Sequence, residues 1–122
     1  LLAKPILIVD DSASMRQMVA FTLQDAGYEV TPANHGKDAL GKIDQKPFKL
    51  VITDLNMPEM DGLQLISALR SKPSSRFLPI IMLTTESQEE KKKEGKQAGA
   101  SAWIVKPFTP EKLIEIVKKY VP

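Results

Sequence analysis

ITDLNMPEMDG, residues 52–62, joins the end of an apolar run to an aspartate and then to a loop that contains proline, glycine and further acids. The run Leu50–Thr53 has the length and composition of a strand that is buried on both faces. A carboxylate loses hydration at the end of such a strand, so an apolar or turn residue would be the more stable choice there. The position of Asp54 therefore needs an explanation from the rest of the chain.

Similar runs of strand length recur along the sequence, at residues 6–9, 28–31, 50–53, 80–83 and 102–105. All except the second are almost continuously apolar, which is typical of strands covered on both faces. The intervals leave room for a helix and two turns between successive runs, as in the βαβ units of a parallel sheet. We therefore expect an α/β fold in one domain, residues 1–122, with a single core.

Helical periodicity fills the segments between and after these runs. Apolar residues recur at i, i+3 and i+4 spacing in four segments: Met15, Met18, Val19, Thr22, Leu23 and Ala26; Ala39, Leu40 and Ile43; Leu63, Ile66 and Leu69; and Leu113, Ile114, Val117, Tyr120 and Val121. Ser14 with Gln17 predicts a capping box for the first helix, and Gly27 follows it as a C′ glycine. Thr109 and Pro110 predict the N-cap and first position of the last helix.

A fourth helix, expected near residues 88–97, differs from the others. Ser87 and Glu90 predict a capping box, but the segment has almost no apolar stripe and contains Gly95. One interpretation is a solvated surface helix. The other is a marginally stable helix whose position shifts, because little packing holds it in place.

The composition excludes several classes of protein. The formal net charge of +2 is too small to indicate nucleic acid or a membrane surface as the partner. The chain has no cysteine, which excludes disulfides and thiolate metal sites, and no apolar run approaches the roughly 20 residues of a membrane span. We expect a cytoplasmic protein, and we expect its only histidine, His35, to be solvated rather than catalytic.

Polar residues follow four of the five predicted strands: Asp10 and Asp11, Asp54, Thr84 and Lys106. Taken singly, each has a structural explanation, such as a helix cap, a turn or a solvated side chain. Because the carboxyl ends of parallel strands meet at one edge of the sheet, we expect these side chains to share a pocket. Three carboxylates repel one another, and one lysine does not offset them, so the cluster indicates a hard divalent cation such as Mg²⁺.

The chemistry of this cluster favours phosphoryl transfer. A carboxylate beside a metal ion suits nucleophilic attack on phosphorus, with an ammonium group to stabilise the incoming charge. Neither a Walker loop nor a G-x-G-x-x-G motif is present, so the donor need not be a nucleotide. The loop after Asp54 does not have the spacing of an EF-hand.

Four motifs together make the chain resemble the receiver domain of two-component response regulators, especially receivers of the CheY type. They are IVDDS at 8–12, DLNMPEMDG at 54–62, LTTE at 83–86 and GASAWIVKPF at 99–108, in the order and spacing of that family. The resemblance covers essentially the whole chain. It implies a flavodoxin-like fold with five helices and a five-stranded sheet in the order 2-1-3-4-5.

The resemblance also implies roles for individual residues. Asp54 would be the phosphoryl acceptor. Asp10, Asp11, Asp54 and the backbone carbonyl of Asn56 would hold Mg²⁺, with Asp10 acting largely through water. Thr84 would be the switch hydroxyl and Lys106 would pair with the phosphoryl group, in a Lys106–Pro107 peptide that is typically cis. Trp103 occupies the position of a Tyr or Phe that changes rotamer in the family, and its larger ring puts that movement in question.

The implied function is a signalling switch rather than an enzyme acting on outside substrates. A histidine kinase would be the phosphodonor, and a target protein would bind the face made by helix four, strand five and helix five, in chemotaxis among other settings. A haloacid-dehalogenase-like phosphatase is the alternative, but it needs a second aspartate where this chain has Asn56. A flavin carrier needs a phosphate loop where Asp10 and Asp11 stand, and the complete acidic set disfavours a degenerate docking module. The domain could stand alone or belong to a longer regulator.

Overall fold

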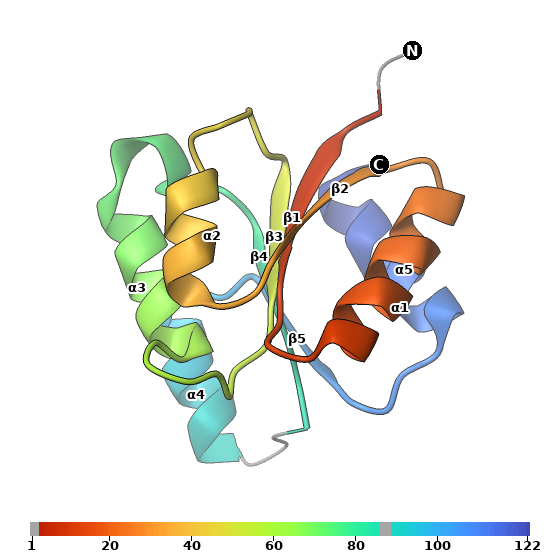
Figure 1. The fold of residues 1–122 in the computed structure, drawn as a ribbon. Helices are drawn as coiled ribbons and strands as arrows, with labels where there is room; N and C mark the ends of the chain where they lie inside the picture. The colour runs from red at the N-terminus through yellow and green to blue at the C-terminus, as the bar shows by residue number, and fades with distance from the viewer. Residues whose placement is uncertain (1–2, 86–88) are drawn as a thin grey trace.

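A computed structural model describes residues 3–85 and 89–122, and it shows a parallel sheet between two layers of helices (Figure 1). The strands are β1 Pro5–Val9, β2 Glu29–Ala33, β3 Leu50–Thr53, β4 Ile80–Thr84 and β5 Ala102–Val105. Their order is β2-β1-β3-β4-β5, and every neighbouring pair is parallel. The predicted flavodoxin-like α/β fold and its strand order are confirmed.

Helices cover both faces of the sheet. They are α1 Ala13–Asp25, α2 Gly36–Lys42, α3 Gly62–Ser71, α4 Glu89–Ala98 and α5 Pro110–Tyr120, with a short 3₁₀ turn at Pro73–Ser75. α1 and α5 lie on one face, and α2, α3 and α4 lie on the other (Figure 1). None of the helices in the described ranges has the length and apolar character needed to cross a bilayer.

Alternation along the strands builds a separate core on each face of the sheet. In β1, Leu7 and Val9 pack toward α2 and α3, whereas Ile6 and Ile8 pack toward α1 and α5. All four side chains are almost completely buried, which explains why the strand reads as one continuous apolar run. The strand ends are therefore fixed from both sides, and the residues that follow them begin from a rigid edge.

Strand β2 differs most from its prediction, since it begins at Glu29 and extends to Ala33. Tyr28 is held outside the strand, because its amide donates to Leu23 O (3.0 Å) and its hydroxyl donates to Val121 O (2.5 Å). Pro32 is tolerated because β2 is an edge strand that pairs only with β1. Proline and exposed residues at this edge concealed the strand's true extent in the sequence.

The helix caps confirm some predictions and correct one. Thr109 caps α5 with Pro110 at its first position, and Gly27 has a φ of +97° immediately after α1, as predicted. The predicted Ser14–Gln17 box is wrong, because α1 begins at residue 13 and Ser12 Oγ accepts the Met15 amide (3.3 Å). The predicted cap at Ser87 lies outside the described residues.

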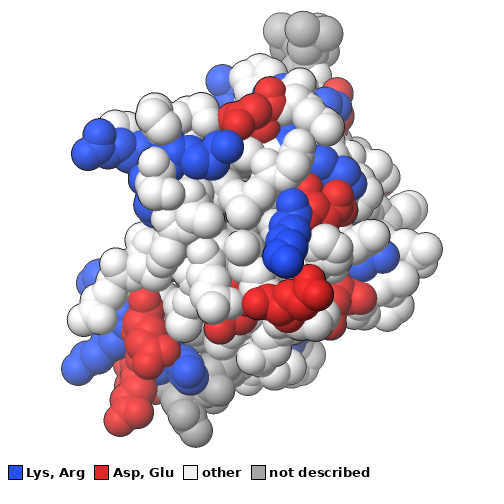
Figure 2. All heavy atoms as spheres, turned by 60° about the vertical axis from the view of Figure 1, so that its left-hand side comes forward, with Lys and Arg blue, Asp and Glu red and all other residues white. Residues whose placement is uncertain are grey.

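Charges are mixed over the surface that α2, α3 and α4 cover. Figure 2 shows lysine and arginine side chains interspersed with aspartate and glutamate on this side of the molecule. A single continuous basic surface is the usual electrostatic footprint of nucleic acid binding, and this side does not present one. α4 itself is exposed, with Gly95 as its only buried residue, in agreement with its polar sequence.

Candidate functional site

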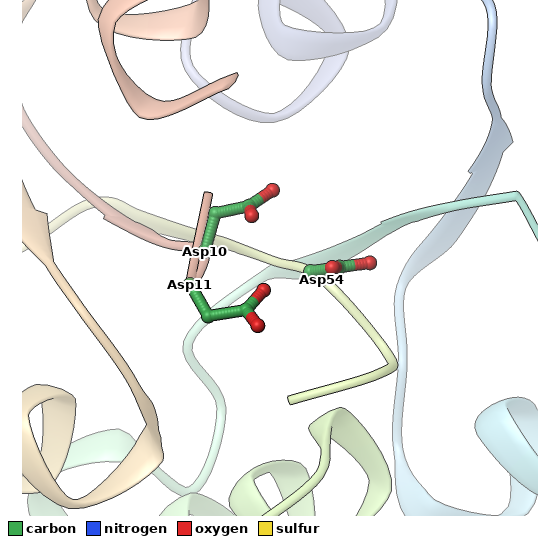
Figure 3. Close-up of side chains that lie close together, drawn as sticks. All are labelled: Asp10, Asp11 and Asp54. Atoms are coloured by element: carbon green, nitrogen blue, oxygen red, sulfur yellow. The ribbon is translucent and has the colours of Figure 1, made fainter. Parts of the chain in front are cut away.

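The acidic residues predicted to meet at the edge of the sheet do so. The Asp54 amide donates to Val9 O (2.9 Å) and the Asp10 amide donates to Ala33 O (3.2 Å), so both residues continue the hydrogen bonding of their strands. Carboxylate oxygens of Asp10, Asp11 and Asp54 all lie within 4.8 Å of one another. Their side chains point into one common space (Figure 3). No other group of three potential metal-ligating side chains occurs in the part of the chain that the structure describes.

Lys106 supplies the positive charge of the cluster. Its Nζ lies 3.3 Å from Asp10 Oδ2 and 3.6 Å from Asp54 Oδ1, and all three side chains are at least 87% buried, with exposures of 13%, 8% and 12%. The backbone amide of Lys106 donates to Thr84 O (2.7 Å), which ties the end of β5 to the end of β4. The Lys106–Pro107 peptide is cis, as the resemblance implied.

Burial raises the pKa of the Asp54 carboxyl above its ordinary value, because the ionised form loses hydration. Lys106 opposes that rise, and the negative charges of Asp10 and Asp11 add to it. A hydrogen bond from the Leu55 amide to Asp54 Oδ1 (2.8 Å) also favours the ionised form. On balance the pKa of Asp54 is raised, chiefly by burial, so a further positive charge beside its carboxylate would favour the ionised form.

The donor set fits a hard divalent cation. Asp10 is buried, Asp54 is largely buried and Asp11 is exposed, so their oxygens offer both anchored ligands and access from solvent. Mg²⁺ prefers such oxygen ligands and usually keeps several waters for a phosphate-bearing partner. Asn56 lies in the loop two residues beyond Asp54 with its side chain exposed, consistent with a contribution through its backbone.

The loop from β3 to α3 is built tightly around Asp54. The Gly62 amide donates to Leu55 O (2.7 Å), and a side chain at Gly62 would overlap the Asp54 carbonyl oxygen. Glu59 takes a left-handed conformation with a φ of +68°, which completes the turn. Asp61 then caps α3 in a reciprocal capping box with Gln64. The glycine and the acids of the opening motif are therefore explained by the geometry of this loop.

Thr84 and Trp103, the two residues predicted to act as a switch, lie on β4 and β5. Thr84 ends β4 and is fully buried beside the core. Trp103 lies in β5, and a Cβ on Gly95 of α4 would be 2.6 Å from its Cζ3 atom. The indole ring is partly exposed and packs directly on the backbone of α4.

Two contacts in the structure were not predicted from the sequence. Arg16 of α1 donates from Nη1 to Asp10 O (2.6 Å), and it lines a small cavity that Asp10 and Asp54 also line. His35 was expected to be solvated, yet its Nδ1 accepts the Asp38 amide (3.1 Å) and caps α2. The Arg16 contact crosses the turn after β1 and depends on the folded chain. The His35 contact is local, but histidine is not among the side chains usually expected as helix caps.

Comparison with known proteins now identifies the family to which this fold belongs. The sequence model of the response regulator receiver domain matches residues 6–118. The chain belongs to this family. As a receiver domain, it is a signalling module of two-component systems.

The relatives of this receiver domain include chemotaxis proteins. CheY1 of Helicobacter pylori is 46% identical over 112 residues, covering 90% of this chain and 90% of that protein. The structure of the chemotaxis response regulator CheY4 of Vibrio cholerae has a TM-score of 0.92 and 49% identity, covering 97% of this chain and 98% of that chain. The receiver domain of a histidine kinase from Syntrophus aciditrophicus has a TM-score of 0.90 and 32% identity, covering 98% and 90%.

Proposed function

We propose that this receiver domain is a phosphorylation-dependent switch in which Asp54 accepts a phosphoryl group from a partner histidine kinase. One observation carries the proposal: an Asp54 oxygen lies within 4.8 Å of oxygens of Asp10 and Asp11, while Lys106 Nζ lies 3.6 Å from Asp54 Oδ1. A nucleophile at a strand end, further acids and a buried ammonium are the parts that phosphoryl transfer to a carboxylate requires.

In the proposed step, an oxygen of the Asp54 carboxylate attacks phosphorus of a phosphohistidine. The new O–P bond gives an acyl phosphate, and the P–N bond breaks with its electron pair remaining on the imidazole nitrogen. The other ring nitrogen of the phosphohistidine carries a proton in this step, so the leaving group is neutral imidazole and no further proton transfer is required. The hydrogen bond from the Leu55 amide (2.8 Å) leaves the Asp54 carboxylate anchored while it reacts.

Mg²⁺ is the proposed cofactor, held by Asp10, Asp11, Asp54 and the backbone carbonyl of Asn56. When bound, Mg²⁺ supplies charge neutralisation for the phosphoryl oxygens. Lys106 is proposed to pair with a phosphoryl oxygen, since its Nζ already lies near Asp54 Oδ1 and its amide is fixed by Thr84 O. Arg16 is proposed to position Asp10 through its hydrogen bond to the Asp10 carbonyl.

The proposed output is a change in the surface formed by α4, β5 and α5, where a target protein binds. Thr84 would move its hydroxyl toward the phosphoryl group, and Trp103 would respond because its ring rests on Gly95 of α4. α4 buries only Gly95, so little packing opposes its displacement. A phosphoryl group that favours one of two arrangements shifts the population between them.

The relatives that carry chemotaxis names support chemotaxis as the pathway. The similar receiver domain of a histidine kinase supports a second setting, in which this domain is one part of a longer protein. Turnover of outside substrates in the manner of a haloacid-dehalogenase-like phosphatase is not proposed, since Asn56 stands where a second catalytic aspartate is needed.

The proposal is tested by incubating the protein with Mg²⁺ and acetyl phosphate and measuring its intact mass. We expect the wild type to gain one phosphoryl group, and we expect Asp54→Ala and an EDTA-treated sample to gain none. Asp44→Ala is a matched control, since Asp44 is an exposed aspartate outside the site and should leave acceptance intact. A phosphorylated Asp54→Ala protein would contradict the assignment of the nucleophile.

A further inference from the structure

Arg70, near the C-terminal end of α3, joins three segments of the chain through its guanidinium group. Its Nη2 and Nε both donate to Gly99 O (2.7 and 3.3 Å), just beyond the end of α4. Its Nη1 lies within hydrogen-bonding distance of the carbonyl oxygens of Ser75 (3.0 Å), Arg76 (3.2 Å) and Leu78 (2.6 Å), between α3 and β4. Among the described residues, no carboxylate forms an ion pair with this arginine. Its hydrogen bonds therefore hold backbone segments together rather than an acidic side chain.

The position of Arg70 is fixed relative to Asp54. α3 begins at Gly62, whose amide donates to Leu55 O (2.7 Å) in the loop that follows Asp54. The helix is then held to the core by leucine and isoleucine side chains that are fully buried. At its other end, a Cβ on Gly99 would lie 2.8 Å from Arg70 Nε, so the turn after α4 fits closely around the guanidinium group. A firmly packed helix thus connects the acceptor loop to the end of α4.

The packing of α4 is concentrated at the same end. α3 and α4 lie side by side on one face of the sheet (Figure 1). Gly95 is the only buried residue of α4, and Ala98 and Ala100 pack against the core on this face, whereas residues 89–94 bury no side chain. The positive charge of Arg70 also lies at the negative end of the α4 dipole, where a cation is stabilising.

We propose that Arg70 is a positioning residue that fixes the C-terminal end of α4, so that the helix rotates about Gly99 when Asp54 is phosphorylated. The rotation rests on the proposed function, whereas the fixed end is a property of the unphosphorylated chain as well. An α-helix rises about 1.5 Å per residue, so Lys93 lies about 9 Å and Gln97 about 3 Å from this pivot. A small rotation therefore moves Lys93 about three times as far as Gln97, whereas a shift of the whole helix moves both equally.

The test measures these two displacements with spin labels in the full chain, which has no cysteine of its own. One variant combines Gln24→Cys in α1 with Lys93→Cys, and the other combines Gln24→Cys with Gln97→Cys; all three side chains are exposed. Distances are measured by double electron–electron resonance before and after phosphorylation by acetyl phosphate with Mg²⁺, which intact mass verifies. We expect the distance to position 93 to change about three times as much as that to position 97. Equal changes, or no change at either position in the phosphorylated chain, would overturn the proposal.

The same pairs of labels test the role of Arg70 itself. Arg70→Met removes the hydrogen bonds, and Arg76→Met is the matched control, since Arg76 is an exposed arginine of the same segment. In Arg70→Met we expect phosphorylation at the wild-type rate but nearly equal changes in the two distances. Arg76→Met should retain the threefold difference of the wild type. A threefold difference that persists in Arg70→Met would exclude Arg70 as the residue that fixes the pivot.

A chain that acetyl phosphate does not phosphorylate would contradict the proposed function, and amide exchange then tests Arg70 separately. The amides of Gly99 and Ala100 both donate to Gly95 O (3.1 and 2.9 Å) in the unphosphorylated protein. Arg70→Met should accelerate their exchange at least about tenfold relative to the Val121 amide at the end of α5, because the end of α4 then opens locally. Unchanged relative exchange would overturn the proposal. Arg70→Lys keeps the charge but not the planar fork, so it should give the same result if Arg70→Met does not fold.

Discussion

Gly62→Ala is expected to destabilise the protein and disturb Asp54, whereas Gly41→Ala is expected to stabilise it. A Cβ at Gly62 would overlap the Asp54 carbonyl oxygen and lie 2.9 Å from Leu55 Cα, and neither backbone atom can rotate away. A Cβ at Gly41, inside α2, would meet no atom within 4 Å. The two variants thus add the same methyl group, once where backbone atoms already fill the space and once where the space is empty.

The two substitutions differ in the sign of their expected effect. Overpacking that moves backbone costs about 1–3 kcal/mol, which corresponds to a fall of roughly 4–12 °C in unfolding temperature for a chain of this size. Alanine in place of an exposed helical glycine contributes about 0.5–1 kcal/mol of stability, so Gly41→Ala should unfold at a higher temperature.

Urea and thermal unfolding, followed by circular dichroism, give both free energies, and intact mass gives the rate of phosphorylation by acetyl phosphate. We expect slower phosphorylation in Gly62→Ala, because the residue that overlaps Asp54 also begins α3. Gly41→Ala should retain the wild-type rate. The reasoning is refuted if Gly62→Ala matches the wild type in stability and rate, or if both variants shift stability in the same direction.

Three further substitutions test individual contacts. Gly95→Ala would put a Cβ 2.6 Å from Trp103 Cζ3, so we expect changed indole emission and a loss of about 1 kcal/mol, and unaltered emission would contradict the packing. His35→Ala removes the acceptor that caps α2 at the Asp38 amide, which should cost about 0.5–2 kcal/mol in urea unfolding, while His35→Asn should retain most of the stability. Asp54→Asn should be more stable than the wild type at pH 7 without metal, because burial above all raises the pKa of Asp54 and thus makes its ionised form unfavourable in the folded state. As the pH falls through that raised pKa toward the ordinary value of 3.8, the wild type becomes protonated and the advantage should shrink, whereas a difference independent of pH would exclude this cause.

The sequence was most informative where strands are covered on both faces. The bounds of β3 and β5 agree with their predictions residue for residue, because burial on both sides requires a continuous apolar run. β2 lies at an edge, contains Pro32 and exposes Glu29, so its pattern is weak and its bounds were misplaced. The start of α1 was misjudged for a different reason: Ser12 and Ser14 are both plausible caps, and only the short turn after β1 decides between them.

The acidic site was predictable because parallel strand ends converge whatever their separation in sequence. That rule brought Asp10, Asp54 and Lys106 together correctly, and the measured distances confirm their proximity. The rule does not predict contacts that helices make with loops or with neighbouring strands. These contacts depend on how each helix is rotated about its axis and shifted along it in the folded chain. Two such contacts are the hydrogen bond from Arg16 to the Asp10 carbonyl and the packing of Trp103 on α4.

The parts of the molecule differ in how firmly packing holds them, and that difference bears on how a signal would travel. Asp54 is fixed by the Val9 carbonyl on one side and by the close approach of Gly62 on the other. Because these contacts hold the backbone of Asp54, negative charge added to its side chain should displace β3 and α3 very little. α4 is ten residues long and buries only Gly95, so it is the element whose displacement loses the least packing. α1 is anchored by the buried side chains of Val19 and Leu23, so its displacement would lose more packing than that of α4.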